Sequence, residues 1–299
     1  MKESTKDIFK LHGWRIDRAV HNYLYFAFYD LYVKYFLKAG RFVRDKLGGL
    51  KLSAAAFGVV FDRYHSKIIT YDNARKMLSV KEDLDLGADY KKRIVPFKYA
   101  NKIILKETDY IAVMDCPCRK SRENGCEPAN VCIAVGKTTA RFWMEHCDKY
   151  NVRKIDADEA LQIIRDARDR GEITTAWFKV ATGARTGVIC NCCKCCCGGL
   201  EGMRIAQSLN YGKELFNTIP SGYKVDYDPQ KCDNCGICAD VCFFDAIEMT
   251  PDGDVLYHAD NCMGCGLCVE KCDQGARSLN ENFKDIYPLD LDIAKKELA

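Results

Sequence analysis

The chain has 299 residues, with 45 Lys and Arg against 42 Asp and Glu and a formal net charge of +3. Hydrophobic residues make up 48% and charged residues 29%, a mix that excludes a largely disordered chain. Cysteine is the outlier, at 19 residues. The opening segment MKESTKDIFK lacks the apolar region of a secretory signal. We therefore expect reduced thiolates that hold metal in the cytoplasm.

No window reaches the roughly 18 uncharged apolar residues that a membrane span needs. The nearest candidate, residues 19–36, contains Asp30 and Lys34, so no span is expected, while peripheral membrane contact stays open. Charge is uneven along the chain, because residues 1–105 carry a net charge of +10 and residues 221–285 a net charge of −8. The acidic stretch could dock on a basic partner or on the basic part of its own chain. We expect no nucleic-acid partner.

Residues 14–47 are predicted to be helical, because apolar side chains recur at steps of three and four, and Gly40 marks a later break. Residues 23–36 are dense in Tyr and Phe, which favours a helix packed in the core or beneath a partner. An interfacial amphipathic helix is the alternative. Its basic residues are Lys34, Lys38, Arg41 and Arg44.

Beyond a short apolar run at residues 54–61, the patterns predict short elements. Helices are expected at residues 72–79, 96–105, 138–150 and 201–210. Strands are expected at residues 111–114 and 173–180. The clearest helix spans residues 156–171, with Asp156 as N-cap and Gly171 as C-cap. Gly198 and Gly199 are expected to break the chain, and Pro220 begins a linker that places a domain boundary near residue 221.

An internal repeat follows that boundary. Two C-x2-C-x2-C-x3-C runs lie 30 residues apart, the first at Cys232, Cys235, Cys238 and Cys242 and the second at Cys262, Cys265, Cys268 and Cys272. Gly236, Gly264 and Gly266 let the backbone of each run approach a metal cluster closely. Zinc or free thiols are the alternative, but zinc sites commonly use separate C-x2-C pairs.

The repeat resembles the bacterial two-cluster ferredoxins, in which each run gives three ligands to one [4Fe–4S] cluster and its fourth to the other. The resemblance implies one cluster on Cys232, Cys235, Cys238 and Cys272 and a second on Cys262, Cys265, Cys268 and Cys242. It covers roughly residues 223–280. Two positions depart from the family, which usually has Pro after the fourth cysteine, whereas this chain has Phe243 and Asp273.

The other cysteines lie between residues 106 and 220. One group is Cys116, Cys118, Cys126 and Cys132, and the other is Cys190, Cys192, Cys193, Cys195, Cys196 and Cys197. Neighbouring side chains diverge, so the second group cannot converge on one centre. We expect one or two further [4Fe–4S] clusters here; inert buried thiols, disulfides and a zinc site are the alternatives. Cys147 stands alone, while Arg119 and Lys194 could offset cluster charge.

Three segments of this middle region resemble uncharacterised 4Fe–4S proteins of anaerobic bacteria and archaea. They are DCPCR at 115–119, TAWFK at 175–179 and ICNCCKCCCGG at 189–199. A fainter resemblance, through Cys116-Pro117-Cys118 and Cys190-Asn191-Cys192, is to ferredoxin-thioredoxin reductase. Neither assigns a catalytic residue, and the chain has no G-x-G-x-x-G or P-loop motif for a nucleotide cofactor.

Together these patterns predict an α+β protein with a mostly helical N-terminal and middle region and a small ferredoxin-like domain at the C-terminus. The expected parts are a basic helical region at 1–105, a cysteine-rich metal-binding region at 106–220, a two-cluster ferredoxin domain at 221–285 and a tail at 286–299. The expected function is electron transfer to a partner redox protein, alone or within a larger complex. The alternative is an oxidoreductase with catalysis, such as disulfide or small-molecule reduction, at the middle cluster.

Overall fold

The computed structural model describes residues 1–47, 64–80, 84–85, 93–95, 104–105, 110–179, 186–208, 217–281 and 286–298. The apolar run expected at residues 54–61 lies outside these ranges, as does most of the helix expected at 96–105. The last two residues of that expected helix instead form strand β3 (Ile104–Leu105), which pairs with β2 (Leu84–Asp85). Local sequence did not reveal this pairing, because β2 lies about twenty residues earlier in the chain.

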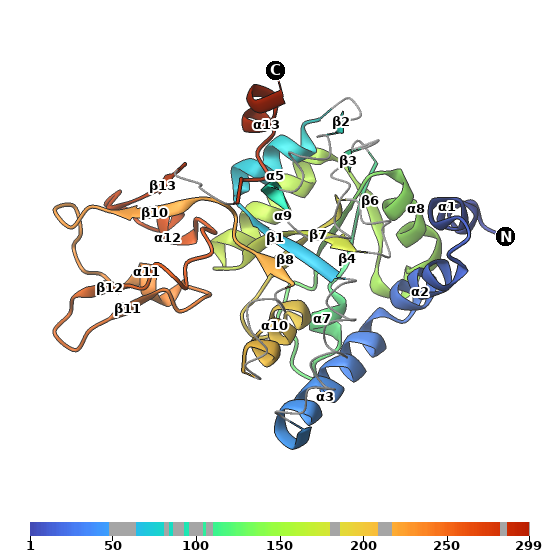
Figure 1. Ribbon diagram of the computed structural model, residues 1–299, viewed down its shortest axis with the longest axis horizontal. Helices are drawn as coiled ribbons and strands as arrows, with labels where there is room; N and C mark the ends of the chain where they lie inside the picture. Colours follow the sequence, from blue (N-terminus) through green and yellow to red (C-terminus); the bar gives the residue numbers. More distant parts are fainter. Residues whose placement is uncertain are drawn as a thin grey trace.

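A seven-stranded sheet forms the centre of the molecule (Figure 1). Its order is β6 (Arg153–Ile155), β4 (Ile111–Asp115), β5 (Asn130–Val135), β8 (Thr186–Cys192), β7 (Ile173–Lys179), β1 (Tyr64–Ile69) and β9 (Thr218–Ile219). Neighbouring strands run antiparallel, except that β1 and β9 are parallel. The strands expected at residues 111–114 and 173–180 are confirmed as β4 and β7.

Helices cover both faces of the sheet. Successive residues of a strand point to opposite faces, and here both sets are apolar, so each face needs a cover. In β4, Ala112 and Met114 face one core, whereas Ile111 and Val113 face the other. The first core takes apolar residues of α1 (Glu3–His12), α2 (Ile16–Ala27), α3 (Tyr29–Leu47), α8 (Lys137–His146) and α10 (Gly198–Ser208). The second core takes those of α5 (Tyr71–Leu78), α9 (Ala157–Asp169) and α13 (Leu291–Leu298).

The N-terminal helices partly follow the expectation. Helix is confirmed across residues 16–47, but the break falls at Phe28, between α2 and α3, and Gly40 lies inside α3. The packed face is confirmed, because Tyr25, Phe26 and Tyr29 are buried in the first core. Other apolar side chains of these helices are exposed, namely Val20, Tyr23, Leu24, Phe28, Leu31, Tyr35 and Phe42. The interfacial helix thus stays a prediction.

Helix α9 forms where its caps predict. The Asp156 carboxylate accepts a hydrogen bond of 2.8 Å from the Glu159 backbone N–H, and Gly171 has a φ of +81° just beyond the C-terminus. The helices expected at 72–79 and 138–150 correspond to α5 and to α8 followed by the 3₁₀ helix η1 (Asp148–Tyr150).

Two expectations for the middle region need correction. It is not mostly helical, because strands β4 to β9 run through it between the helices. Gly198 and Gly199 also do not break the chain, because α10 begins at Gly198. A side chain at Gly199 would lie 2.3 Å from the Trp177 ring, and one at Gly198 would lie 2.8 Å from Val33 Cγ1. These glycines allow close packing at the start of a helix.

The cysteine repeat lies on a small unit at one side of the sheet (Figure 1). Strand β10 (Lys224–Tyr227) pairs with β13 (Arg277–Asn280), and β11 (Ile247–Met249) pairs with β12 (Val255–Tyr257), all antiparallel. The short helices α11 (Ile237–Asp240) and α12 (Leu267–Glu270) follow the cysteine loops.

The domain boundaries predicted at residues 105, 220 and 285 stay predictions. The sheet takes β1 from before residue 105 and its other strands from after it. Among the described residues, no helix has both the length and the apolar character needed to cross a membrane.

Candidate metal centres

The two cysteine runs of the C-terminal unit interlock around two cavities. The first is lined by Cys232, Cys235, Cys238 and Cys272. The second is lined by Cys242, Cys262, Cys265 and Cys268. Each cavity thus receives three cysteines from one run and the fourth from the other. The structure brings together the two sets that the ferredoxin resemblance implies.

Backbone N–H groups of these loops point at the thiol sulfurs. The N–H of Asn234 donates to Cys232 Sγ at 3.4 Å, that of Gly264 donates to Cys262 Sγ at 3.4 Å, and that of Ala246 donates to Cys242 Sγ at 3.2 Å. Such donors stabilise negative charge on thiolate and help set the potential of a bound cluster. The donor set therefore fits a thiolate-bound iron–sulfur cluster in each cavity.

The second cavity lies deeper than the first. Burial raises the pKa of Cys265 to about 11 and that of Cys268 to about 12. A thiol in such surroundings becomes a thiolate at neutral pH when a metal binds it. In the first cavity, by contrast, Cys235 is exposed.

The Cys262–Cys268 loop is built against the linker that precedes the unit. Gly264 has a φ of +63°, and a Cβ there would lie 2.3 Å from the Tyr223 carbonyl oxygen and 2.4 Å from Ser221 Oγ. Ser221 is fully buried and its hydroxyl donates to the Gly264 carbonyl at 2.7 Å. Glycine is required here by the backbone conformation and by the closeness of the linker.

The two departures from the ferredoxin pattern have different surroundings. Phe243 is 2% exposed and packs in the first core of the sheet together with Leu200 and Met203 of α10. The Arg204 guanidinium lies 5.0 Å from the Phe243 ring. Asp273, in contrast, is exposed. At residue 243 a side chain that joins the unit to α10 replaces the usual proline.

A buried arginine joins the unit to α9. Arg168, whose side chain is 2% exposed, forms an ion pair of 2.7 Å with Glu270 and donates to the Cys265 carbonyl at 2.7 Å. It also donates to Thr174 Oγ1 at 3.3 Å, and Thr174 in turn donates to Asn191 Oδ1 at 3.3 Å. All three polar residues of this path are buried. The path leads from the second cavity to the residue between Cys190 and Cys192.

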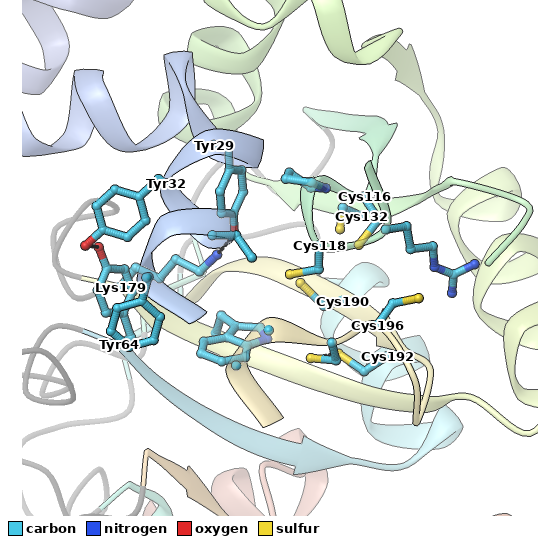
Figure 2. A pocket seen from close by; sticks show the side chains of 18 of the residues that line it. Tyr29, Tyr32, Tyr64, Cys116, Cys118, Cys132, Lys179, Cys190, Cys192 and Cys196 are labelled. Atoms are coloured by element: carbon cyan, nitrogen blue, oxygen red, sulfur yellow. Dashed lines mark hydrogen bonds between the residues drawn. The ribbon is translucent and has the colours of Figure 1, made fainter. Parts of the chain in front are cut away.

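Eight cysteines of the middle region line a pocket on the first face of the sheet (Figure 2). They are Cys116, Cys118, Cys132, Cys190, Cys192, Cys193, Cys196 and Cys197. Cys132 on β5 lies directly across the ladder from Cys190 on β8. The thiol of Cys116, at the start of α7 (Pro117–Lys120), hydrogen-bonds to those of Cys118 and Cys132. Cys197 Sγ lies 3.3 Å from Cys192 Sγ.

The far side of this pocket is aromatic and polar. Figure 2 shows Tyr29, Tyr32, Tyr64 and Lys179 facing the cysteines. Lys179 is 2% exposed, donates to the Tyr29 hydroxyl at 2.5 Å, and its ammonium lies 5.3 Å from the Trp177 ring. This side has the apolar walls and few polar groups typical of a small-molecule site.

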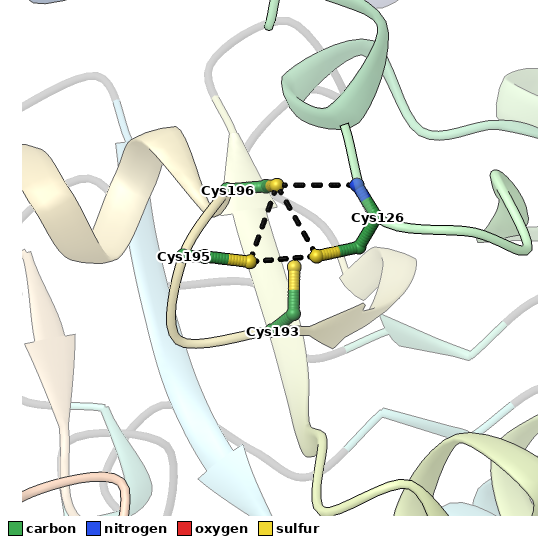
Figure 3. A group of neighbouring side chains, drawn as sticks. All are labelled: Cys126, Cys193, Cys195 and Cys196. Atoms are coloured by element: carbon green, nitrogen blue, oxygen red, sulfur yellow. Dashed lines mark hydrogen bonds between the residues drawn. The ribbon is translucent and has the colours of Figure 1, made fainter. Parts of the chain in front are cut away.

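Four cysteines of the two groups form a compact cluster. Cys126 lies in the loop before β5, and Cys193, Cys195 and Cys196 lie on the turn between β8 and α10 (Figure 3). Their four sulfurs all lie within 4.8 Å of one another. Cys193 and Cys196 of this cluster also line the pocket, together with Cys190, Cys192 and Cys197 of the same run, whereas Cys126 and Cys195 do not.

The remaining residues that the sequence singled out are accounted for by packing and ion pairs. Cys147 is buried apart from both groups, and burial raises its pKa to about 12, as in an inert thiol. Arg119 is buried and pairs with Glu172 at 2.7 Å. Lys194 is exposed and pairs with Asp245 of the C-terminal unit at 2.7 Å.

Sequence patterns missed the groups that connect and complete these sites. Arg168 was part of a predicted helix with no signal for its role, because its partners lie about a hundred residues later. Lys179 lies within the TAWFK segment, which could have drawn attention to it. The pocket-lining tyrosines were visible only as a helix dense in aromatic residues.

Comparison with protein families identifies the C-terminal unit. Residues 231–276 match the family model described as a 4Fe-4S dicluster domain. The match includes both cysteine runs and supports binding of 4Fe–4S clusters by this unit. A comparison with curated proteins found no match to the chain. The resemblance drawn from the middle region stays a prediction.

Proposed function

We propose that this protein is an iron–sulfur electron carrier with two ferredoxin-type [4Fe–4S] clusters and a third cluster in the pocket. The first two would use the cysteines of the two interlocking cavities, as the dicluster match supports. We expect it to act in the reducing cytoplasm, where thiolates persist. Low-potential electrons would pass from it to a partner redox protein.

The observation that carries this proposal is the buried path from the second cavity to the pocket. Arg168 contacts the Cys265 carbonyl and Thr174, and Thr174 contacts Asn191 beside two pocket cysteines. Phe243 and Leu267 add apolar packing between the C-terminal unit and the sheet. A buried contact of this kind supports electron exchange between the two parts of the chain.

The pocket fits a third cluster by its donors. A [4Fe–4S] cluster needs four thiolates, and the pocket is lined by eight cysteines from the start of α7, from β5 and β8, and from the turn before α10. The cluster would supply one-electron transfer, while the chain holds it between the sheet and α3. Apart from Cys193 and Cys196, which also belong to the compact cluster, two pocket cysteines would remain without an iron to bind.

Those two extra thiols favour a second candidate function, the reduction of a disulfide or small molecule in the pocket. The buried Lys179 ammonium and the Tyr29 hydroxyl, 2.5 Å apart, could orient a substrate and hold a proton opposite the cysteines. Electrons would then arrive from the dicluster unit rather than leave through it.

Metal analysis of the full chain, purified without oxygen, tests the proposal. Three clusters predict about twelve irons and twelve acid-labile sulfides per chain. A count of about eight irons per chain would contradict the third cluster. A preparation that holds zinc alone would overturn the whole proposal.

Thiol chemistry separates the two candidates. A reductase predicts that two pocket cysteines form a disulfide on mild oxidation and are reduced again when electrons enter the dicluster unit. A carrier predicts no such disulfide, which mass spectrometry of alkylated peptides would report. Lys179→Met should abolish turnover in a reductase and leave electron delivery by a carrier unchanged.

A further inference from the structure

We propose that Cys126, Cys193, Cys195 and Cys196 bind a single zinc ion, separate from every iron–sulfur cluster of the chain. The four thiols come from two segments about seventy residues apart in sequence (Figure 3). Cys193 and Cys196 also line the pocket, so a zinc ion on these four thiols would leave six pocket cysteines for a cluster. The proposal does not depend on the electron-transfer function.

The spacing of the sulfurs fits one ion. In a tetrahedral zinc site each Zn–S bond is about 2.3 Å, so the sulfurs lie about 3.8 Å apart. Here Cys195 Sγ lies 3.4 Å from Cys196 Sγ, and Cys196 Sγ lies 3.6 Å from Cys126 Sγ. Cys126 and Cys195 approach more closely, at 2.7 Å, which a shared ion would relax outward slightly.

The same spacing does not fit a [4Fe–4S] cluster. A cube places two irons and the bridging sulfides between any two of its thiolates, so its ligands must stand well apart. Among the residues that the structure describes, this is the one group of three or more metal-binding side chains found this close together. The two four-cysteine sets of the dicluster unit are not gathered within that distance and instead line two cavities.

The surroundings suit a closed, negatively charged site. Four thiolates give zinc a net charge of −2, and the Arg122 guanidinium lies beside them, donating to the Cys196 carbonyl at 3.3 Å. The Cys126 backbone N–H donates to Cys196 Sγ at 3.5 Å. Four protein ligands leave no open coordination position, as in structural zinc sites.

The position of the site indicates what it stabilises. The turn between Cys193 and Cys195 carries Lys194, which pairs with Asp245 of the C-terminal unit. Arg204 donates both to the Lys194 carbonyl, at 3.4 Å, and to the Phe243 carbonyl, at 3.2 Å. Zinc would therefore hold in place the turn on which the dicluster unit docks, tying it to the loop of Cys126.

Metal analysis of single variants in the full chain tests the proposal. The wild-type chain, purified without oxygen, is expected to hold one zinc beside its iron. Cys195→Ser and Cys126→Ser should each lose that zinc while iron and the visible absorption of the clusters stay unchanged. Cys147→Ser, at a buried cysteine outside both groups, is the matched control and should keep both metals. Cys192→Ser reports on the pocket instead and should lower iron alone.

A second measurement uses the wild-type chain, so it tests the site even if the variants fail to fold. Growth with cobalt should place Co²⁺ in the wild-type site and give the absorption bands of a tetrahedral tetrathiolate. A loss of about four irons in Cys195→Ser would assign the site to a cluster and overturn the proposal. One iron in place of zinc, or a Cys126–Cys195 disulfide in the anaerobic protein, would also overturn it. Absence of the third cluster would leave the zinc result intact.

Discussion

Arg168 joins the dicluster unit to the cysteine-lined pocket of the sheet. It is buried at the end of α9, yet its guanidinium reaches Glu270, the Cys265 carbonyl and Thr174 at once. Arginine suits this place because its planar group offers five donors in fixed directions. Its positive charge also lies beside the cysteines of the second cavity.

Replacing Arg168 with Met should lower the reduction potential of the cluster in the second cavity. Reduction adds an electron, so a nearby cation favours the reduced form, and its removal favours the oxidised form. An interaction of about 1 kcal/mol corresponds to about 40 mV for a one-electron couple. A redox titration followed by EPR measures the shift.

Two variants control that measurement. Arg165→Met removes the same charge from the same helix, but Arg165 is exposed and contacts Tyr71 and Gln162 instead. Arg168→Lys keeps the charge and loses the fork of donors, so the reduction potential of its cluster should stay closer to the wild-type value than that of Arg168→Met. Equal potentials in Arg168→Met and the wild type would contradict the role assigned to Arg168.

Gly264 is a second single residue on which one cluster should depend. Gly264→Ala should displace the loop that carries Cys262 and Cys265, because the new methyl group would meet the Tyr223 carbonyl at 2.3 Å. We expect loss of one cluster, about four irons per chain, measured by iron analysis.

Gly253 provides a matched control for backbone strain. Its φ of +86° is also positive, but a Cβ there meets nothing within 4 Å. Gly253→Ala should cost about 1–2 kcal/mol of stability and keep all its iron. Equal iron content in the two variants would show that the approach of the linker does not matter.

At the scale of elements, Phe243 makes α10 part of the docking surface. Phe243→Ala should cost about 3 kcal/mol of packing between the C-terminal unit and α10. Hydrogen–deuterium exchange should therefore rise in α10 and around Phe243. Leu256→Ala, on β12, removes an apolar side chain that is 45% exposed and should leave both segments protected. Unchanged exchange in Phe243→Ala would mean that other contacts hold the unit.

The elements also show which features a sequence can predict. The caps of α9, the strands β4 and β7 and the two cysteine runs depend on local patterns and were predictable. The seven-stranded sheet was not, because β1 and β9 join it from distant parts of the chain. The gathering of ten middle cysteines in a pocket and an adjoining compact cluster, which share Cys193 and Cys196, depends equally on such distant contacts.

At the scale of the whole molecule, the dicluster unit is acidic, whereas residues 1–105 are basic. Among the described residues, ion pairs join the unit to the middle region at Glu270, Asp245 and Lys271. None of these pairs uses the basic residues before residue 105. Among the described residues 221–281, most acidic side chains form no ion pair with the middle region, and we expect them to attract a basic partner.

Electron delivery to a basic acceptor protein should accordingly slow as salt is added. The Debye length falls from about 30 Å at 0.01 M to about 8 Å at 0.15 M ionic strength, which screens attraction between separate molecules. We expect the second-order rate, measured by stopped flow from the dithionite-reduced protein, to fall about tenfold across that range. A small uncharged quinone as acceptor is the control and should show little change. A rate to the basic protein that is equally indifferent to salt would place the electron exit away from the acidic surface.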